Sequence, residues 1–351
     1  MSVEFSKRIG QKLFVEIVKP NCCSGWNIDV YNNPFDGYAK LGMVDCYGTF
    51  FPNGDSAQKP YQYFRHTDIS TNTYRFGNIV DLGENYLSPQ KGILFKGEIA
   101  DKDTPIDGTY KKMSDEPLIY GFSSSEKKCE YIFKKDGLEV NEANHFKIKA
   151  FPWPIAIREH QSLYPNCSTF LQPSTFIGTL DNKPIMGLGS FDRQFLSQEI
   201  KTFEQVSMGY ISCSGMGIRE DGRREYLLIS ISLREDNKIL VIYWLEGENP
   251  IITDKVSVDA TWEHLPYCDD GTCIYKDAIF YFANKEIHFE GQWGSKGFTE
   301  KPRIEKHGQS QVFGRWYEGK QPYKHRLWYS INENMDAYDW KLKELGFNVI
   351  D

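Results

Sequence analysis

Six Asp-Gly or Asn-Gly pairs divide this chain into short segments, and they constrain its fold more than any other feature. Such pairs tolerate the positive φ angles that tight hairpin turns require. The segments between them are rich in aromatic and β-branched residues, with 21 Tyr and 23 Phe among 351 residues, and these residue types favour strands. The sequence therefore predicts a meander of short antiparallel strands that turns at Asp36-Gly37, Asn53-Gly54, Asp107-Gly108, Asp136-Gly137, Asp221-Gly222 and Asp270-Gly271.

The clearest predicted hairpin lies at residues 226–245. Leucine and isoleucine recur at every second position of residues 226–234, which is the period of a half-buried strand. Residues 235–238 supply a polar turn, and the almost wholly apolar residues 239–245 form the partner strand. Further strands are predicted at residues 278–282, 286–293, 311–317 and 325–331.

Helical periodicity is found mainly at the C-terminus. Tyr338, Leu342 and Leu345 share one helical face, and Gly346 supplies a stop signal. Residues 3–13 are compatible with a second short amphipathic helix. Because so few helices alternate with the strands, we predict an all-β fold with a short C-terminal helix rather than a doubly wound α/β fold.

The chain is long enough for two domains. Its 351 residues, 40% of them hydrophobic, can form two ordinary cores. Pro152 and Pro154 bracket Trp153, and such prolines remove hydrogen-bond donors and force extended backbone. We therefore predict two β-rich units of similar size, residues 1–165 and 166–351.

Charge and hydropathy limit the partners that we expect. The 41 Lys and Arg against 48 Asp and Glu give a net charge of −7, and no run of five basic residues is present. These features argue against nucleic acid and anionic membranes as partners. The first ten residues lack an apolar secretory core, and no window approaches 18 consecutive apolar residues. We expect a cytoplasmic protein without membrane insertion.

The cysteines and glycines do not indicate a cofactor or a metal. Of eight cysteines, only Cys268 and Cys273 are closely spaced without being adjacent, and no second pair completes a zinc knuckle. We expect reduced, mostly structural cysteines. The Gly187-Leu-Gly189 sequence lacks the third glycine of a dinucleotide-binding turn, and no Walker loop or Gly-x-Ser-x-Gly elbow is present.

The most suggestive residues for chemistry are Asp192 and Arg193. They follow a predicted hairpin that begins at Gly178. A guanidinium stays charged and can orient a carboxylate or a substrate oxygen through paired donors. The sequence equally fits a partly buried structural ion pair.

Partners for Asp192 are sought among histidines that lie close to acids, guanidinium groups and aromatic rings. Neighbouring residues on a strand point to opposite faces, so ordinary surface or hydrogen-bonded histidines also fit these patterns. The candidates fall in two segments, one with Tyr63, Arg65 and His66 and the other with Trp262, Glu263 and His264.

The segment from Gly178 to Gln194 contains a strand, a short turn, a Gly-x-Gly strand and an aromatic-Asp-Arg-Gln string. This pattern resembles the motif of the carotenoid 1,2-hydratase, AttH and kievitone hydratase-like proteins. The resemblance continues through residues 217–222 and the following hairpin, and it covers roughly the C-terminal half. That family pairs two lipocalin-like β-barrels, so the resemblance implies this fold here. The chain has Phe191 and Phe195 where the family usually has tryptophan.

The resemblance also implies an activity. It points to a cofactor-independent lyase or isomerase that is hydratase-, dehydratase- or cyclase-like and acts on a hydrophobic isoprenoid- or polyketide-like small molecule. Asp192 would exchange a proton with an alkene or with the water adding to it, and a neighbouring His or Tyr would stabilise the charge. Aromatic residues commonly contact ligands in such pockets, although they also pack cores. The candidates for substrate contact are Trp26, Tyr63, Arg65, Trp244, Trp262 and Trp293.

Two other functions fit the sequence. One is a non-catalytic lipocalin-like carrier of a hydrophobic ligand, and the other is a carbohydrate-active β protein. A ligand-contacting Asp192 would favour the enzyme, whereas an Asp192 held by Arg193 away from any cavity would favour the carrier. Carboxylates that face each other across a groove would favour the carbohydrate-active protein.

Overall fold

The structure is a computed structural model of the full chain. The part that it describes comprises residues 2–6, 13, 15–20, 22, 40–68, 73–75, 79–81, 91–92, 104–105, 111–115, 118–123, 129–142, 146–160, 167–196, 209–233, 238–265, 271–296, 309–319 and 325–350. The predicted all-β class is confirmed, because the described elements are strands with one short helix. No helix in the described part is long and apolar enough to cross a membrane.

The chain divides into two compact units, each formed by separate stretches of sequence. Unit 1 contains residues 1–13, 82–91 and 207–351, and unit 2 contains residues 14–81 and 92–206. The boundary predicted near residue 165 differs from this division, since strands on either side of it pair with each other in unit 2. The prolines at 152 and 154 mark a corner between two strands of the same sheet, where the Trp153 N–H donates to the Pro173 carbonyl at 2.9 Å.

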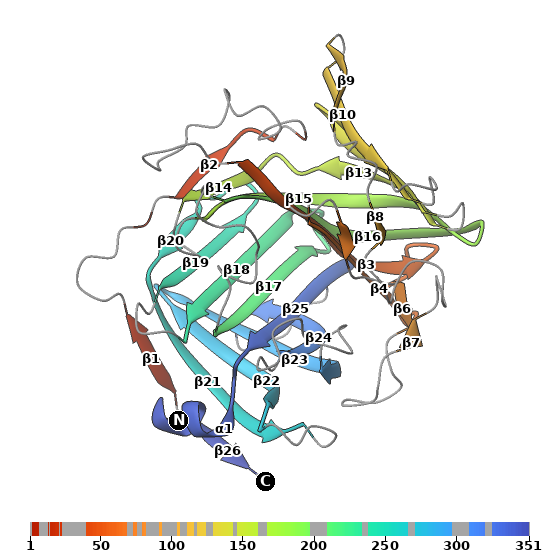
Figure 1. The fold of residues 1–351 in the computed structure, drawn as a ribbon. Helices are drawn as coiled ribbons and strands as arrows, with labels where there is room; N and C mark the ends of the chain where they lie inside the picture. Colours follow the sequence, from red (N-terminus) through yellow and green to blue (C-terminus); the bar gives the residue numbers. More distant parts are fainter. Residues whose placement is uncertain are drawn as a thin grey trace. The chain divides into compact units, whose positions relative to one another are not determined.

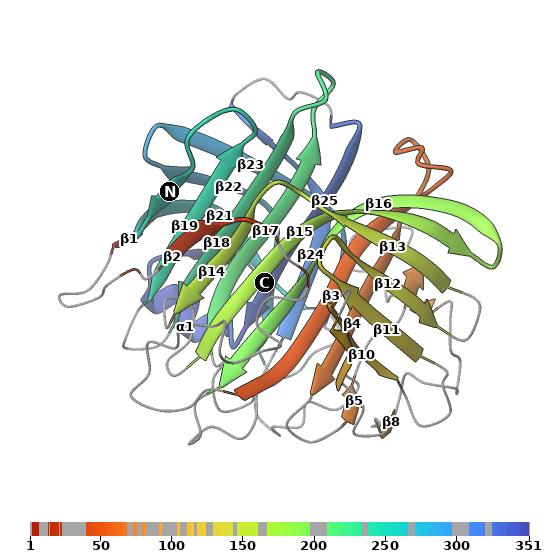
Figure 2. The same ribbon diagram turned by 90° about the horizontal axis from the view of Figure 1, so that it is seen from above.

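Unit 2 is built on a sheet of fifteen described strands, ordered β7-β6-β4-β3-β16-β15-β13-β12-β11-β10-β9 along its main path. Figure 2 shows the long strands of this sheet side by side and curved. The strands are β2 Val15–Val18, β3 Lys40–Pro52, β4 Tyr61–Asp68, β5 Thr73–Arg75, β6 Ile79–Asp81, β7 Lys91–Gly92, β8 Thr104–Pro105, β9 Lys111–Asp115, β10 Leu118–Ser123, β11 Cys129–Lys134, β12 Gly137–Glu142, β13 Phe146–Pro152, β14 Ala156–His160, β15 Cys167–Leu180 and β16 Lys183–Leu196.

The core of unit 2 lies on one face of this sheet and is strongly aromatic. Side chains at alternate positions point to this face, as the pleat of a strand requires. The rings of Phe50 and Phe176 stack at 5.5 Å, and Phe146 meets Phe50 edge-on at 5.4 Å. On β16 the inward positions are Phe191 and Phe195, which both belong to this core.

Unit 1 is built on a sheet of eleven described strands, ordered β1-β21-β22-β23-β24-β25-β17-β18-β19-β20, with β26 parallel to β21 (Figure 1). A short helix, α1 Asp339–Glu344, precedes β26. The strands are β1 Val3–Ser6, β17 Tyr210–Ile218, β18 Arg224–Ser232, β19 Ile239–Leu245, β20 Ile251–Thr253, β21 Lys255–His264, β22 Cys273–Phe282, β23 Lys285–Lys296, β24 Gln309–Glu318, β25 Leu327–Met335 and β26 Asn348–Ile350.

The C-terminal helix covers part of the unit 1 core, as its sequence predicted. Leu342 is buried in this core, and Gly346 ends the helix with a φ of +95°. Its amide donates to the Lys343 carbonyl at 3.0 Å. Phe347, just after the stop, places its ring 5.7 Å from that of Trp262.

The predicted hairpin of residues 226–245 is confirmed as β18 and β19, and the four later strands are confirmed as β22 to β25. Two details differ. β18 is buried on both faces rather than half-buried. The alternation of residue types along it therefore separates two buried surfaces that differ in polarity. Residues 3–6 were compatible with a helix by sequence, but they form β1, which pairs with β21. Only Phe5 of these residues is buried, between exposed Glu4 and Ser6, and this alternation suits a strand.

Candidate functional site

The β15–β16 hairpin brings Asp192 into the middle of the unit 2 sheet. Asp181 and Asn182 form its turn with φ angles of 48° and 63°, which short Asx side chains tolerate. Asp192 then pairs with Leu171 of β15 on one side and with Asp45 of β3 on the other. The hairpin predicted from the sequence is therefore confirmed, and the backbone around Asp192 is held from both sides.

Two hydroxyl groups hold the Asp192 carboxylate. Tyr47 of β3 donates to Asp192 Oδ2 at 2.6 Å, and Ser190, two residues before it on β16, donates to Oδ1 at 2.6 Å. Asp192 is 6% exposed and Ser190 is buried, whereas Tyr47 is half-buried. Both carboxylate oxygens thus accept a short hydrogen bond, which fixes the orientation of the carboxylate.

Arg193 points to the opposite face of the sheet. Its Nη1 donates to the Cys22 carbonyl at 2.7 Å, and its guanidinium lies 4.3 Å from the ring centre of Phe170 and 5.2 Å from that of Phe191. Arg193 is fully buried on the core face, with cation–π contacts that compensate part of its desolvation. The two residues that the sequence suggested as a pair therefore act in different environments.

Tyr63, a predicted substrate-contacting residue, belongs to a second polar group in unit 2. The hydroxyls of Tyr63 and Tyr131 donate to Glu142 Oε1 at 2.9 and 2.8 Å, and they lie 2.5 Å from each other. All three residues are buried among aromatic rings. The side chains of Arg65 and His66, on the same strand, lie outside the described residues, as does Trp26.

The remaining predicted residues lie in unit 1. Trp262 is fully buried, with its ring 4.6 Å from that of Tyr275, and Trp244 is 8% exposed on β19. Glu263 is half-buried next to Trp262 on β21. His264 Nε2 lies 3.9 Å from Asp339 of α1.

Trp293 is described only by its backbone in β23. Within each unit, then, the structure places the predicted residues in several separate environments.

Sequence reasoning missed the partners of Asp192. Ser190 was detectable in principle, because it lies two positions before Asp192 and shares its face of β16. Tyr47 left no comparable signal, since it lies 145 residues away and meets Asp192 only through the pairing of β3 with β16.

It also missed a buried charged cluster in unit 1, here called the Glu225 cluster and formed by Arg219, Glu225, Tyr243 and His325. Arg219 donates to both carboxylate oxygens of Glu225 at 2.6 and 3.1 Å, and the Tyr243 hydroxyl donates to Oε1 at 2.6 Å. His325 Nε2 lies 2.8 Å from Glu225 Oε2. The available signal was Glu225 itself, an acid in phase with the inward-facing leucine and isoleucines of β18.

The electrostatics of this cluster follow from its contacts. Burial by itself raises the pKa of Glu225, but the hydrogen bonds from His325, Arg219 and Tyr243, together with the charge of His325, outweigh it and lower the pKa to about 2. Glu318 and Lys285 extend the cluster, with Lys285 Nζ 2.8 Å from Glu318 Oε1. Because every group has an opposite charge or a hydroxyl beside it, the cluster is fitted to hold Glu225 ionised inside the core.

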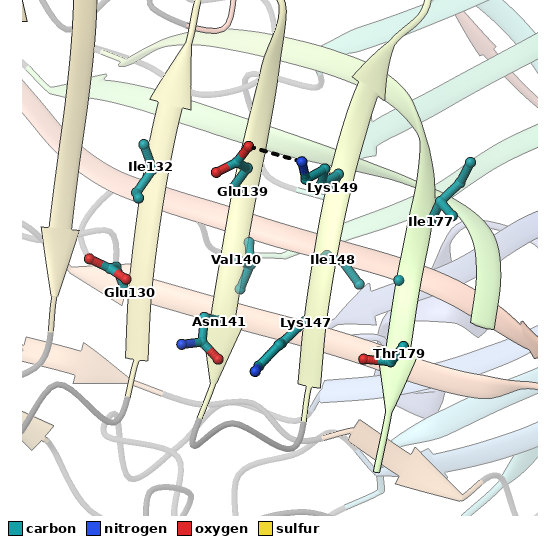
Figure 3. A pocket seen from close by; sticks show the side chains of 11 residues that line it. Glu130, Ile132, Glu139, Val140, Asn141, Lys147, Ile148, Lys149, Ile177 and Thr179 are labelled. Atoms are coloured by element: carbon teal, nitrogen blue, oxygen red, sulfur yellow. Dashed lines mark ion pairs between the residues drawn. The ribbon is translucent and has the colours of Figure 1, made fainter. Parts of the chain in front are cut away.

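A depression of about 480 Å³ lies on the outer face of the unit 2 sheet, over β11, β12, β13 and β15 (Figure 3). Its side chains alternate in charge, and Glu139 lies 3.4 Å from Lys149. A hydrogen bond from Lys134 lowers the pKa of Glu139 and, with the charges of Lys134 and Lys149, outweighs the opposing effect of burial. Ile177 in this depression is six residues from the partner of Asp192 along β15, roughly 20 Å, so the depression is a solvated face apart from Asp192.

In the described part of the chain, four cysteines are buried: Cys22, Cys46, Cys213 and Cys273. Burial raises the pKa of Cys213 strongly, and burial with the nearby Asp339 charge raises that of Cys273 to about 12, so both remain thiols. Among the described residues, no group of three or more His, Cys, Asp and Glu is arranged to hold a metal ion.

Comparisons with known proteins give matches among solved structures. No family model matches the chain, and no curated protein sequence matches it. A structure designated AttH from Nitrosomonas europaea aligns with a TM-score of 0.44 and 11% identity over 85% of this chain and 93% of its own. The protein CghA aligns with a TM-score of 0.41 and 10% identity over 93% of this chain and 99% of its own.

Kievitone hydratase from Nectria haematococca aligns with a TM-score of 0.36 and 9% identity over 92% of this chain and 98% of its own. An AttH structure and a kievitone hydratase, whose names also belong to the group that the sequence around Asp192 resembles, are thus among the solved structures to which this chain is similar.

Proposed function

We propose that this protein is a cofactor-independent lyase or isomerase that moves a proton within a hydrophobic, isoprenoid- or polyketide-like small molecule, with Asp192 as the proton carrier. The observation that carries the proposal is the setting of Asp192, a nearly buried carboxylate that is held by the hydroxyls of Tyr47 and Ser190. The alternative of an Asp192 neutralised by Arg193 is disfavoured, because Arg193 lies on the other face of β16.

The chemistry requires one group that accepts and returns a proton. In a dehydration, the Asp192 carboxylate would take a proton from carbon and pass it to the departing hydroxyl, leaving an alkene and water. Hydration is the reverse of this step, and an isomerisation returns the proton to a different carbon. Each reaction is balanced by one proton and involves no change in net oxidation state, so one positioned carboxylate can carry it.

Tyr47 and Ser190 would act as positioning residues. Their hydrogen bonds hold both carboxylate oxygens in fixed directions, and positioning of an acid–base group contributes strongly to its efficiency. Tyr47 is half-buried, whereas Asp192 is nearly buried, so Tyr47 is the more accessible member of the pair. The burial of Asp192 limits contact with bulk water, which protects a carbanion-like or carbocation-like intermediate.

The test is native mass spectrometry of the protein purified from its own host, with organic extraction of bound small molecules. Wild type and Asp192→Asn are compared, with Asp136→Asn, an exposed turn residue between β11 and β12, as the matched control. We expect an apolar compound that wild type and Asp136→Asn transform and that Asp192→Asn retains, with at least about a hundredfold loss of rate.

Other outcomes would reject the proposal. A ligand that wild type and Asp192→Asn both hold unchanged would identify a carrier. Equal turnover by the two proteins would place the chemistry elsewhere. A bound glycan, with no apolar compound, would favour the carbohydrate-active alternative.

A further inference from the structure

Among the described residues of unit 1, three that face its apolar core carry side-chain polar atoms without a hydrogen-bonding partner. These atoms are both side-chain amide atoms of Asn332, Oδ1 of Asn334 and Nε1 of Trp262. All three residues are 0% exposed. Trp262 belongs to the apolar core cluster itself.

The two asparagines point into the same core. Asn332 pairs with Val312 of β24 and Cys213 of β17, and Asn334 pairs with Ile211 of β17. Val312, Cys213 and Ile211 are core residues, and paired residues on adjacent strands point to the same face of a sheet. The carboxamides are therefore inside unit 1, two positions apart on one strand.

Two hydrogen bonds connect Asn334 to β22, the strand that also carries the ring neighbour of Trp262. Asn334 Nδ2 donates to Ser310 Oγ at 3.4 Å, and Ser310 Oγ donates to the Cys273 carbonyl at 2.9 Å. Tyr275, two residues further along β22, places its ring 4.6 Å from that of Trp262. The Cys273 N–H donates to the Ala337 carbonyl just before α1, and Trp262 contacts Phe347 just after it, so Asn334 and Trp262 both lie towards the end of the core that α1 covers.

Such an arrangement is unusual for a structural core. Nearly all buried polar groups in folded proteins are hydrogen-bonded, because an unmet donor or acceptor loses its contacts with water and gains nothing. Replacing either asparagine by leucine would conserve its volume and remove this cost. A bound polar molecule would supply the contacts that these carboxamide and indole atoms lack.

We propose that this end of unit 1 binds a small uncharged molecule that carries both a hydrogen-bond donor and an acceptor, such as a carboxamide or an alcohol. Asn332 offers two donors and an acceptor, Asn334 offers an acceptor and Trp262 offers a donor. None of these groups is charged, and a charged ligand would be buried at high cost without a counter-charge. These residues belong to unit 1, whereas Asp192 belongs to unit 2.

The test uses the indole N–H of Trp262 as a reporter. The full chain is labelled with 15N-tryptophan, which gives eight indole positions, and Trp262→Phe identifies the signal of Trp262. N-methylacetamide and ethanol are titrated as uncharged probes. Acetate and ethylammonium are titrated as charged probes. Ethylammonium is included because the acidic residue Asp336 lies two positions after Asn334 and could attract a cation.

We expect the Trp262 signal to shift saturably with the uncharged probes and not with the charged ones. Asn332→Leu should weaken binding of N-methylacetamide by at least about tenfold. Asn348→Leu, the same change at an exposed position of β26, should bind as wild type does.

Three results would overturn the proposal. One is a Trp262 signal that contacts long-lived water and does not respond to any probe, which would identify internal water alone. Another is equal binding by wild type and Asn332→Leu. The third is a Trp262 signal that responds more strongly to a charged probe than to the uncharged ones. This last comparison uses only the wild-type protein, so it remains decisive even if Asn332→Leu does not fold.

Discussion

The imidazole of His325 lies 2.8 Å from the carboxylate of Glu225 inside unit 1, although the two residues are 100 positions apart in the sequence. The backbone of Gly217 makes room for the ring, since a Cβ there would lie 2.2 Å from His325 Nε2. The indole of Trp316 lies beside the ring, with the centres 5.1 Å apart. The pair is thus fixed by packing as well as by charge.

Glu225→Gln should destabilise the protein by about 3 kcal/mol at neutral pH, because it removes one member of a buried ionic network. The measurement is urea unfolding of wild type and variant, followed by tryptophan fluorescence. Glu246→Gln is the control, because Glu246 is half-buried and paired with Arg224 nearer the surface, where an ion pair contributes about 0–1 kcal/mol. Equal losses in the two variants would contradict the importance of the buried network.

The contribution of Glu225 should depend on pH in a defined direction. Its pKa in the folded protein, about 2, is below its ordinary value of 4.5, so the folded state binds this proton less tightly than the unfolded state. The stabilisation is therefore fully present above pH 4.5 and is lost as the pH falls towards 2.

The difference in unfolding free energy between wild type and Glu225→Gln should accordingly shrink between pH 5 and pH 2.5. This is measured by repeating the urea titrations across the range. A difference that stays constant with pH would show that the variant acts through packing alone.

Gly217→Ala should destabilise the protein by about 1–3 kcal/mol, because the added methyl group overlaps the His325 ring and overpacking carries such a cost. His325→Ala removes the ring and should relieve this overlap. In a double-mutant cycle measured by thermal unfolding, the combined variant should therefore be less destabilised than the sum of the single variants. Strict additivity would mean that Gly217 serves some purpose other than space for His325.

The local parts of the fold could be predicted from the sequence. The β18–β19 hairpin follows from two apolar runs with a polar turn between them, and the end of α1 follows from Gly346, because both signals lie within a few residues of the structure that they determine. The unit boundary could not be predicted, since the prolines near Trp153 are compatible with a corner in one sheet as well as with a linker.

The candidate site was predictable only in part. Asp192 was identified from its own neighbourhood in the sequence, but the side chains that hold it depend on which strands pair. The alternation of faces along β16 predicts that Asp192 and Arg193 point apart, yet adjacency in the sequence suggested a pair. The Tyr47 contact and the His325 contact both cross more than 90 residues, and no local pattern contains such information.

Arg193→Lys should lower stability rather than act directly on chemistry. Lysine cannot reproduce the planar contact of the guanidinium with Phe170 together with the hydrogen bond to the Cys22 carbonyl. We expect a loss of about 2 kcal/mol in unfolding free energy, whereas Asp192→Asn should change it less. Thermal unfolding of both variants measures this, and a stable Arg193→Lys protein with impaired turnover would instead assign Arg193 a role at the site.

Tyr47→Phe provides the most specific test of how Asp192 is positioned. The change removes one hydroxyl and keeps the ring, so the Oδ2 atom of Asp192 loses a 2.6 Å hydrogen bond while the packing of β3 against β16 is retained. With the compound recovered from the wild-type protein as substrate, we expect kcat to fall about tenfold, with a smaller change in KM, because the hydroxyl acts on the carboxylate rather than on substrate binding. Tyr61→Phe, on the neighbouring strand β4, is the control for loss of a phenol in unit 2, since Tyr61 packs against the opposite, core face of the sheet. A rise in KM at constant kcat would mean that Tyr47 binds the substrate directly, and unchanged kinetics would show that Asp192 needs no partner from β3.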